Sequence, residues 1–418
     1  MNTYDVVVAG GGAGGVGAAI GAAKAGARVA LVEKFGFLGG AATNAQVLAY
    51  CGFYHQGDAP ITAVAGAAED VLAAMRDLGI EAKPYHSPTT QNWIVLLEPE
   101  RLKVALDRVC AAHGIDVRLH SRINGASVVD GMIHTVEIGE PAQRINLAAA
   151  AFVDASGDAV LARTAGVALR VGDGAGGIQA YTMPLRIGGL APGPRIDRED
   201  IKRAVTRYNA TTNDPIHRTD GGIYTRVPGT TDFWWLIVDR DMPDLSARSF
   251  TRAEQRAREM GLALVDVMRT EVPGFEHAWL AQTGPQIGVR ESRHPAAQAE
   301  VQRGDVIGGR LHADGIARAA WPIELHGEAG RPVYERIGGA GYYHVPYGAI
   351  CAEGVGNLWY AGRVIGADAA AYGSIRVMGT AFATGEAAGT AAALMAQSGT
   401  FPDASAVRAQ LTAKGALL

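Results

Sequence analysis

The sequence has few cysteines, almost no net charge and no long apolar run. Cys51, Cys110 and Cys351 stand far apart and form no C-x-x-C pair, so neither a disulfide framework nor a thiolate metal site is indicated. The 38 basic and 42 acidic residues leave a net charge of −4, which gives no general attraction to nucleic acid. No apolar stretch reaches the ~20 residues of a membrane span, and the first residues do not resemble a signal peptide. These absences predict a cytoplasmic protein that binds no metal, nucleic acid or membrane.

Glycine and apolar residues are abundant instead. The chain has 418 residues, of which 48% are hydrophobic and 55 are glycine, without the period of collagen. Because single cores stop growing at ~250–300 residues, we expect two lobes. Most prolines and both adjacent tryptophans fall between residues 168 and 345. We therefore predict an α/β protein in which residues 1–167 and 346–418 form one nucleotide-binding domain, interrupted by a substrate domain of residues 168–345.

The first forty residues predict a β-α-β unit with a dinucleotide fingerprint. An apolar strand over residues 5–9 leads into Gly10, Gly12 and Gly15, which form G-x-G-x-x-G, and a small-residue helix follows. The glycines allow a tight turn, close approach of a pyrophosphate to the helix N-terminus, and close helix–strand packing. Glu33 ends the second strand, where a carboxylate would accept hydrogen bonds from a ribose. A glycine-rich turn with a surface glutamate is the structural alternative. The predicted contacts of this unit also include Ala13, Gly14 and Lys34.

Three later segments could complete a site for a flavin dinucleotide. Small residues after Glu33 would let the chain pass the pyrophosphate, and a buried strand over residues 150–154 ends in a turn that could return to the adenosine. Near the C-terminus, Asp368 is predicted to hold ribityl hydroxyls, and a helix would begin facing the flavin N1/O2 edge. Gly385 and Gly389 would let that helix lie close to the sheet. The candidate cofactor residues of these segments are Gly39, Gly40, Ala41, Thr43, Ala155, Gly157, Asp158, Gly362, Arg363, Asp368, Ser374, Ile375, Arg376 and Val377.

Taken together, these segments resemble the FAD-dependent oxidoreductase family of the glutathione-reductase-like flavoprotein superfamily, over nearly the whole chain. The resemblance implies a discontinuous Rossmann FAD-binding domain with an inserted α+β substrate domain, and redox chemistry on a small organic molecule. Two departures leave the substrate open: His294-Pro295-Ala296-Ala297 follows the second arginine of the motif, and Met378-Gly379 replaces Gln-Pro. The matching segments are residues 5–43, 98–114, 152–158, 288–293 and 358–389. We expect non-covalent FAD, because no His, Cys or Tyr stands in residues 39–44; His55 would be the first alternative.

Candidate catalytic residues fall in the predicted substrate domain. Arg290, Arg293 and His294 could form an anion or carbonyl clamp beside a proton acceptor, or a structural ion pair with Glu291. His326 and His344 lie near the return to the FAD-binding domain, and either could be a base or a structural residue. We rank His294 and His344 above His326. Adjacent strand residues face opposite ways, so at most one of Trp234 and Trp235 lines a cavity. Cys51 could line the pocket or pack in the core.

The function predicted from these patterns is removal of a hydride from a C–H bond of a small organic substrate. No second G-x-G-x-x-G for NAD(P)H is present, which favours a dehydrogenase or oxidase. The alternative is a non-redox nucleotide-binding protein or a thiazole-synthase-like enzyme. We expect a small-molecule substrate and an electron acceptor that the sequence does not identify, and the sequence leaves a homo-oligomer open.

Overall fold

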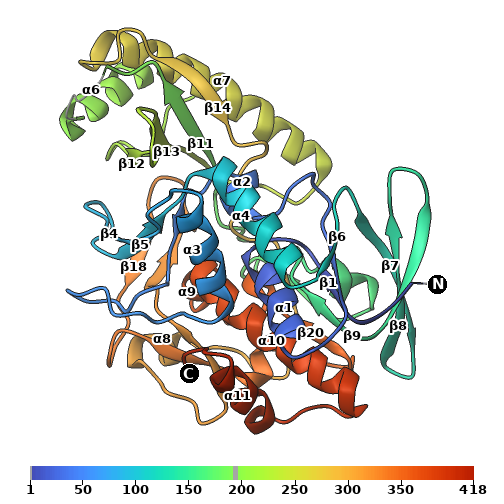
Figure 1. Ribbon diagram of the computed structural model, residues 1–418. Coiled ribbons are helices and arrows are strands. Elements are labelled where there is room, and N and C mark those ends of the chain that lie inside the picture. The colour runs from blue at the N-terminus through green and yellow to red at the C-terminus, as the bar shows by residue number, and fades with distance from the viewer. Residues whose placement is uncertain (1, 192–195) are drawn as a thin grey trace.

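The computed structural model describes residues 2–191 and 196–418, and its centre is a seven-stranded sheet (Figure 1). β1 pairs in parallel with β2 and β9, and β2 pairs in parallel with β6. β7 and β8 extend the sheet beyond β9 as an antiparallel pair. The strands are β6 (Asp116–Arg118), β2 (Val29–Val32), β1 (Asn2–Ala9), β9 (Arg144–Asp154), β8 (Met132–Gly139), β7 (Arg122–Val129) and β20 (Leu358–Tyr360). The parallel Rossmann-like core of a mixed α/β protein is thus confirmed.

The predicted β-α-β unit is present at the start of the chain. β1 and β2 flank α1 (Ala13–Lys24), and their apolar side chains are buried because the sheet is covered on both faces. Gly10 has a φ of +100°, a conformation that L side chains rarely adopt. A Cβ on Gly15 would lie 1.7 Å from the Gly10 carbonyl oxygen, so this helix can meet the strand only through glycine.

The C-terminal segment returns to this sheet. β20 pairs in parallel with β9 at Phe152–Asp154, while the earlier part of β9 pairs with β8. α10 (Met378–Ser398) then packs along α1. A Cβ on Gly385 would lie 2.1 Å from the Gly14 oxygen, and one on Gly389 would lie 1.8 Å from the Ala18 oxygen. The two glycines that we expected to bring this helix close to the sheet therefore abut α1 instead.

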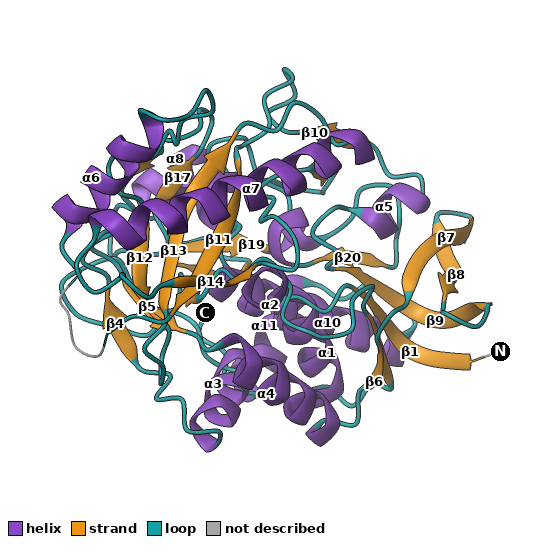
Figure 2. Ribbon diagram, turned by 90° about the horizontal axis from the view of Figure 1, so that it is seen from above, coloured by secondary structure: helices purple, strands orange, loops and turns teal. Residues whose placement is uncertain are grey.

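A second, antiparallel sheet stands apart from the first (Figure 2). Its order is β12 (Ile223–Arg226), β13 (Phe233–Arg240), β11 (Tyr181–Gly188) and β14 (Trp279–Thr283). α6 (Arg198–Asn209) and α7 (Ala247–Glu271) cover it and enclose a hydrophobic core separate from that of the main sheet. Trp235 belongs to this second core, whereas Trp234 belongs to the first. The boundaries of the proposed inserted domain stay predictions.

Smaller elements complete the described chain. A three-stranded sheet and three two-stranded sheets lie outside the two large ones. No helix in residues 2–191 and 196–418 is long and apolar enough to cross a membrane. The remaining elements are α2 (Ala41–Asn44), β3 (Ala49–Tyr50), α3 (Ala67–Asp77), β4 (Pro84–His86), β5 (Trp93–Leu96), α4 (Pro99–Ala112), α5 (Val160–Thr164), β10 (Leu169–Val171), β15 (Arg293–Pro295), α8 (Arg303–Gly308), β16 (Gly315–Ala319), β17 (Ile323–Leu325), β18 (Val333–Glu335), β19 (Tyr343–Pro346), α9 (Tyr372–Ile375), α11 (Ala404–Ala413) and two 3-10 turns (Tyr347–Ile350 and Gly362–Val364).

Candidate active site

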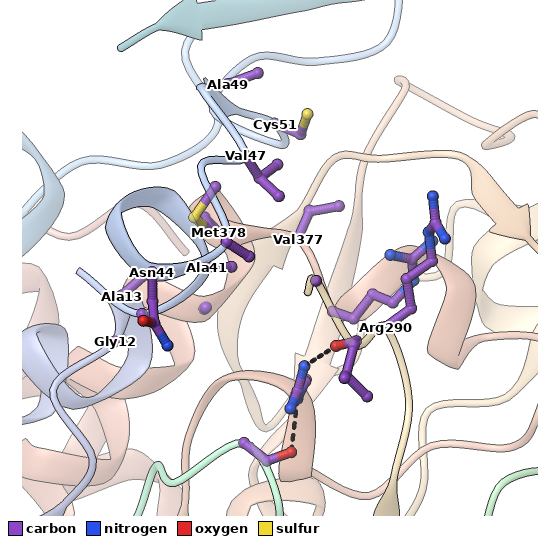
Figure 3. Close-up of a pocket in the computed structure, with 18 of the residues that line it drawn as sticks. Gly12, Ala13, Ala41, Asn44, Val47, Ala49, Cys51, Arg290, Val377 and Met378 are labelled. Atoms are coloured by element: carbon purple, nitrogen blue, oxygen red, sulfur yellow. Dashed lines mark hydrogen bonds between the residues drawn. The ribbon is translucent and has the colours of Figure 1, made fainter. Parts of the chain in front are cut away.

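A continuous cavity borders both large sheets, and the space open to the centre of a water molecule is about 370 Å³. Figure 3 shows Gly12 and Ala13 on one side of it and Arg290 on the other. Its glycine-rich end is lined by Gly10, Gly12, Ala13, Gly14, Glu33, Lys34, Gly40, Ala41, Ala155, Gly157, Asp158, Gly362 and Arg363. Its opposite end is lined by Trp234, Arg290, Trp321, Glu324, His326, Arg376 and Val377. The cavity therefore joins the predicted dinucleotide segments to residues of the predicted substrate domain.

The glycine-rich end can accommodate a pyrophosphate. α1 begins after Gly12 with no side-chain cap and no acidic residue in its first turn, so its N-terminal N–H groups are left for an anion. Gly40 faces Gly12 so closely that a Cβ on Gly40 would lie 2.8 Å from the Gly12 Cα. Larger side chains at these two positions would fill the space in which phosphate oxygens could approach the backbone.

Glu33 borders this end and keeps part of its hydrogen-bonding capacity. Its Oε2 accepts from the Gly11 N–H at 2.6 Å, and its Oε1 accepts from the Phe35 N–H at 2.9 Å. Each carboxylate oxygen has a second lone pair, so the buried group can also accept from ribose hydroxyls. The same bonds fix the fingerprint loop to the end of β2.

An ion-pair network connects the C-terminal return to the turn after β9. Asp158 accepts from Arg363 Nη2 and from the Ser292 hydroxyl, both at 2.9 Å, and Lys34 Nζ lies 3.7 Å from its other oxygen. Arg363 Nε also donates to the Gly157 carbonyl at 2.6 Å. Burial by itself raises the pKa of Asp158, but Arg363 and Lys34 outweigh it and hold the pKa below its ordinary value. The carboxylate stays ionised at the cavity edge.

Several predicted cofactor residues lie outside the cavity lining. Gly39, Thr43 and Gly15 shape the fingerprint loops; the Thr43 hydroxyl, for instance, donates to the Leu38 carbonyl at 2.7 Å. Ser374 and Ile375 are fully buried, with Ser374 Oγ 2.6 Å from the Tyr343 hydroxyl.

Asp368 also departs from its predicted position. Its two carboxylate oxygens accept from the Arg303 and Ala371 N–H groups, both at 2.7 Å, because the residue turns the chain into α9. It does not border the cavity. Asp368 therefore lies outside the cavity in which it was predicted to contact the ribityl chain.

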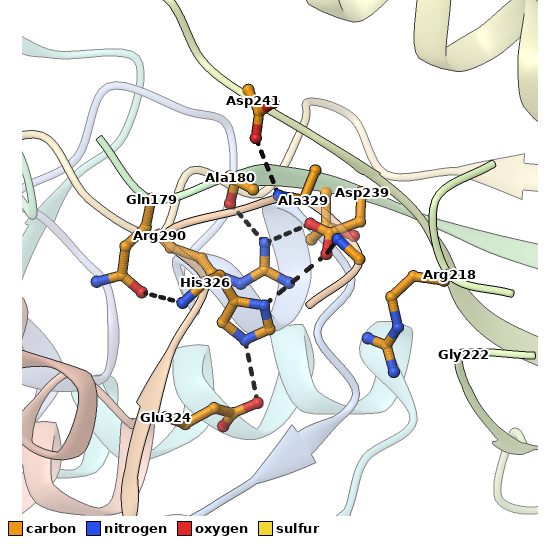
Figure 4. Close-up of polar contacts among 12 residues, drawn as sticks. Gln179, Ala180, Arg218, Gly222, Asp239, Asp241, Arg290, Glu324, His326 and Ala329 are labelled. Atoms are coloured by element: carbon orange, nitrogen blue, oxygen red, sulfur yellow. Dashed lines mark hydrogen bonds and ion pairs between the residues drawn. The ribbon is translucent and has the colours of Figure 1, made fainter. Parts of the chain in front are cut away.

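The opposite end carries a polar cluster around His326 (Figure 4). His326 Nε2 lies 3.1 Å from Glu324 Oε1, and its Nδ1 lies 3.8 Å from Asp239 Oδ2. Asp239 in turn accepts from Arg290 Nη1 at 3.0 Å. Burial raises the pKa values of both carboxyl groups, but Arg290 and His326 at Asp239, and His326 and Arg376 at Glu324, hold them well below the usual range. His326 thus stands between two carboxylates.

Of the predicted catalytic residues, His326 and Arg290 border the cavity, whereas His294, His344 and Arg293 do not. His294 Nε2 lies 2.9 Å from Glu291 Oε1 in the protein interior. His344 Nδ1 lies 3.1 Å from the His312 carbonyl, and Arg293 sits in β15 away from the cavity. Among the histidines of the described chain, His326 alone lines this cavity.

Sequence reasoning missed Asp239 and Glu324. Asp239 lies near the end of β13, after its apolar residues. Glu324 lies two residues before His326, so the E-x-H spacing was a signal that could have been used. Trp234 lines the cavity and donates from Nε1 to the Gln46 carbonyl at 2.8 Å, while Trp235 does not line it, as predicted. Cys51 also borders the cavity, where burial raises the pKa of its thiol.

Comparison with known proteins identifies the family. The family model described as FAD dependent oxidoreductase matches residues 5–413. A comparison with curated proteins gives no match.

The solved structures that match this chain include a reductase-like protein, a halogenase and a brominase. A geranylgeranyl bacteriochlorophyll reductase-like protein from Thermoplasma acidophilum is 14% identical, with a TM-score of 0.49 over 99% of this chain and 83% of that one. The myxobacterial chondrochloren halogenase is 13% identical, with a TM-score of 0.46 over 99% of this chain and 79% of that one. A flavin-dependent brominase is 15% identical, with a TM-score of 0.48 over 99% of this chain and 83% of that one. At these scores the likenesses add nothing to the assignment, which depends on the family match. The chain belongs to the FAD-dependent oxidoreductase family and is an enzyme that uses FAD.

Proposed function

We propose that the protein is a dehydrogenase or oxidase that removes a hydride from a C–H bond of a small organic substrate. The observation that supports this proposal is the single cavity joining the uncapped N-terminus of α1 to His326 and Arg290. When bound, FAD supplies the two-electron acceptor. The substrate gives up a hydride and a proton, and its carbon gains a double bond. We place the reaction in the cytoplasm, in keeping with the three free cysteines of the described chain. A separate electron acceptor would reoxidise the flavin.

We infer that the FAD-binding domain is discontinuous and glutathione-reductase-like. Gly12, Ala13 and Gly14 would hold the pyrophosphate, and Glu33 the adenosine ribose. The N-terminus of α10, which follows Val377 and has no side-chain cap and no acidic residue in its first turn, would offer its positive end to the flavin edge. Residues 168–345 would form the inserted substrate domain.

His326 is the residue that we propose to take the substrate proton. Its Nε2 faces Glu324, and its Nδ1 has no hydrogen-bond partner among the described residues. An Nε2–H that donates to Glu324 leaves Nδ1 to accept a proton. Asp239, 3.8 Å from Nδ1, would then balance the new positive charge.

Anaerobic reduction tests the proposed reaction. We expect the purified protein to be yellow, to release FAD on acid precipitation, and to bleach when mixed anaerobically with a substrate that carries an oxidisable C–H bond. Rapid bleaching by NADH or NADPH, with no bleaching by any organic substrate, would overturn the proposal. A colourless protein that releases another adenine nucleotide would favour the non-redox alternative.

The role of Glu33 gives a second test. Replacing Glu33 by Gln removes the charge that accepts ribose hydrogen bonds, so we expect the Kd for FAD to rise about tenfold or more, since hydrogen bonds to charged groups contribute ~1.5–3 kcal/mol. Equilibrium dialysis with the deflavinated protein measures this change. Glu353→Gln, at an exposed position, is the matched control and should leave the Kd unchanged. An unaltered Kd for Glu33→Gln would remove Glu33 from the site.

A further inference from the structure

Three arginines line the cavity, and their partners differ. Arg290 is bonded to Asp239 and Arg363 to Asp158. Arg376 has a different environment, because its one hydrogen bond within the described part of the chain is from Nη2 to the backbone carbonyl of Glu324, at 3.0 Å. Its Nε is buried without a partner, and no carboxylate of the described residues lies within 4.0 Å of its guanidinium. Arg376 is therefore the cavity arginine that no acidic side chain pairs with directly.

The nearby Glu324 carboxylate already has hydrogen-bond partners. The Glu324 carboxylate accepts from Trp321 Nε1 at 2.9 Å and from the Tyr334 hydroxyl at 3.0 Å, and it lies 3.1 Å from His326 Nε2. It cannot turn toward Arg376 without losing these bonds. A guanidinium nitrogen that is removed from water and left without an acceptor is costly, and that cost falls when a bound anion supplies the acceptor.

We propose that Arg376 binds the carboxylate of the substrate, so that the substrate class is a small organic monocarboxylic acid. The planar guanidinium suits two parallel hydrogen bonds to a carboxylate. Because Arg376 is one unpaired cation in the cavity wall, a single anionic group on the substrate would neutralise it. This inference rests on the proposed function and assigns to substrate a residue that the sequence placed with the cofactor.

The rest of this end of the cavity indicates the body of the acid. Aromatic and aliphatic side chains come from the four-stranded and three-stranded sheets, namely Tyr85, Ile94, Leu96, Tyr224, Trp234 and Leu236. Such walls favour an apolar or flat group, held by burial and ring packing. With its carboxylate at Arg376, the acid would lie beside His326, which borders the same space.

Matched acids and amides test the proposal on the FAD-loaded enzyme. Benzoate and phenylacetate are compared with benzamide and phenylacetamide, by calorimetry and by the shift in the absorption spectrum of bound FAD. We expect the acids to bind at least tenfold more tightly than the amides. Arg376→Met should weaken acid binding about 10- to 100-fold and leave amide binding unchanged. Arg376→Lys should weaken acid binding less than Arg376→Met does. Arg170→Met is the control, because Arg170 is also half-buried and bonded to carbonyls but lies outside the cavity.

The outcomes separate this proposal from the proposed function. Equal or undetectable binding of acids and amides by the parent enzyme would overturn it, and so would unchanged acid binding by Arg376→Met. Loss of FAD from both Arg376 variants, with normal acid binding by the FAD-loaded fraction, would also overturn it and return Arg376 to the cofactor. Acid binding that depends on Arg376, without reduction of FAD by any organic acid, would support the role of Arg376 and overturn the proposed oxidation.

Discussion

Replacing His326 by Gln is expected to slow substrate-driven reduction of the bound FAD by ~10²–10⁴-fold, the range of general base catalysis. Gln can still hydrogen-bond to Glu324 but cannot accept the substrate proton. FAD should stay bound, because the glycine-rich end of the cavity is built by other elements. Stopped-flow absorbance under anaerobic conditions measures the limiting rate.

A second histidine variant separates loss of the base from a general effect on the protein. His344→Gln is the control, since His344 does not border the cavity. If His326→Gln stays within a few-fold of the parent, the base is another group and the proposed proton path is wrong.

Replacing Glu386 by Gln is expected to stabilise the fold at alkaline pH. Glu386 lies on α10 with 2% of its surface exposed, and its Oε2 accepts from the Ala67 N–H at 3.0 Å. Its Oε1 has no partner, and burial raises the pKa of the carboxyl group to about 7. The folded protein therefore retains a proton that the unfolded chain, with an ordinary pKa, releases. This group favours folding least above pH 7, where the buried carboxylate must ionise.

The size and sign of this effect follow from the shift. Gln resembles the protonated acid, so Glu386→Gln should differ little from the parent near pH 4.5 and gain stability as pH rises to about 7. The gain should level off above that pH at up to about 3 kcal/mol, given ~1.4 kcal/mol for each pKa unit. Urea unfolding at pH 5 and pH 8 measures the difference. Glu353→Gln, at an exposed position, should show no such pH trend, and equal stabilities of Glu386→Gln and the parent at pH 8 would contradict the prediction.

Local sequence patterns were sufficient for the nucleotide end of the cavity. The strand, the glycine spacing and Glu33 lie within thirty residues of one another, and each residue type is required by backbone geometry or by a charge at a strand end. The return of the chain after residue 346 was visible because a short apolar strand is followed by a helix rich in alanine and glycine, as in the first unit.

The substrate end could not be predicted in the same way. The cluster around His326 joins β13, the loop before β15 and the β17 hairpin, which are distant in sequence and carry no shared motif. His294 was ranked high because Arg290 and Arg293 are its sequence neighbours. In the structure it pairs with Glu291 and does not border the cavity. The backbone contacts of Asp368 were not predictable, because an acidic residue after a glycine-rich turn can either face a ligand or accept from backbone N–H groups.

The packing of α10 on α1 has a consequence for how the enzyme acquires its cofactor in the cell. The ribosome releases the fingerprint glycines long before Gly362, Arg363 and the start of α10, which line the same cavity. A nascent chain that lacks them has an open α1 surface of glycines and no closing wall. The proposed FAD site is therefore complete only after this region has been translated, and until α10 packs on α1 the glycine face of α1 has no partner helix.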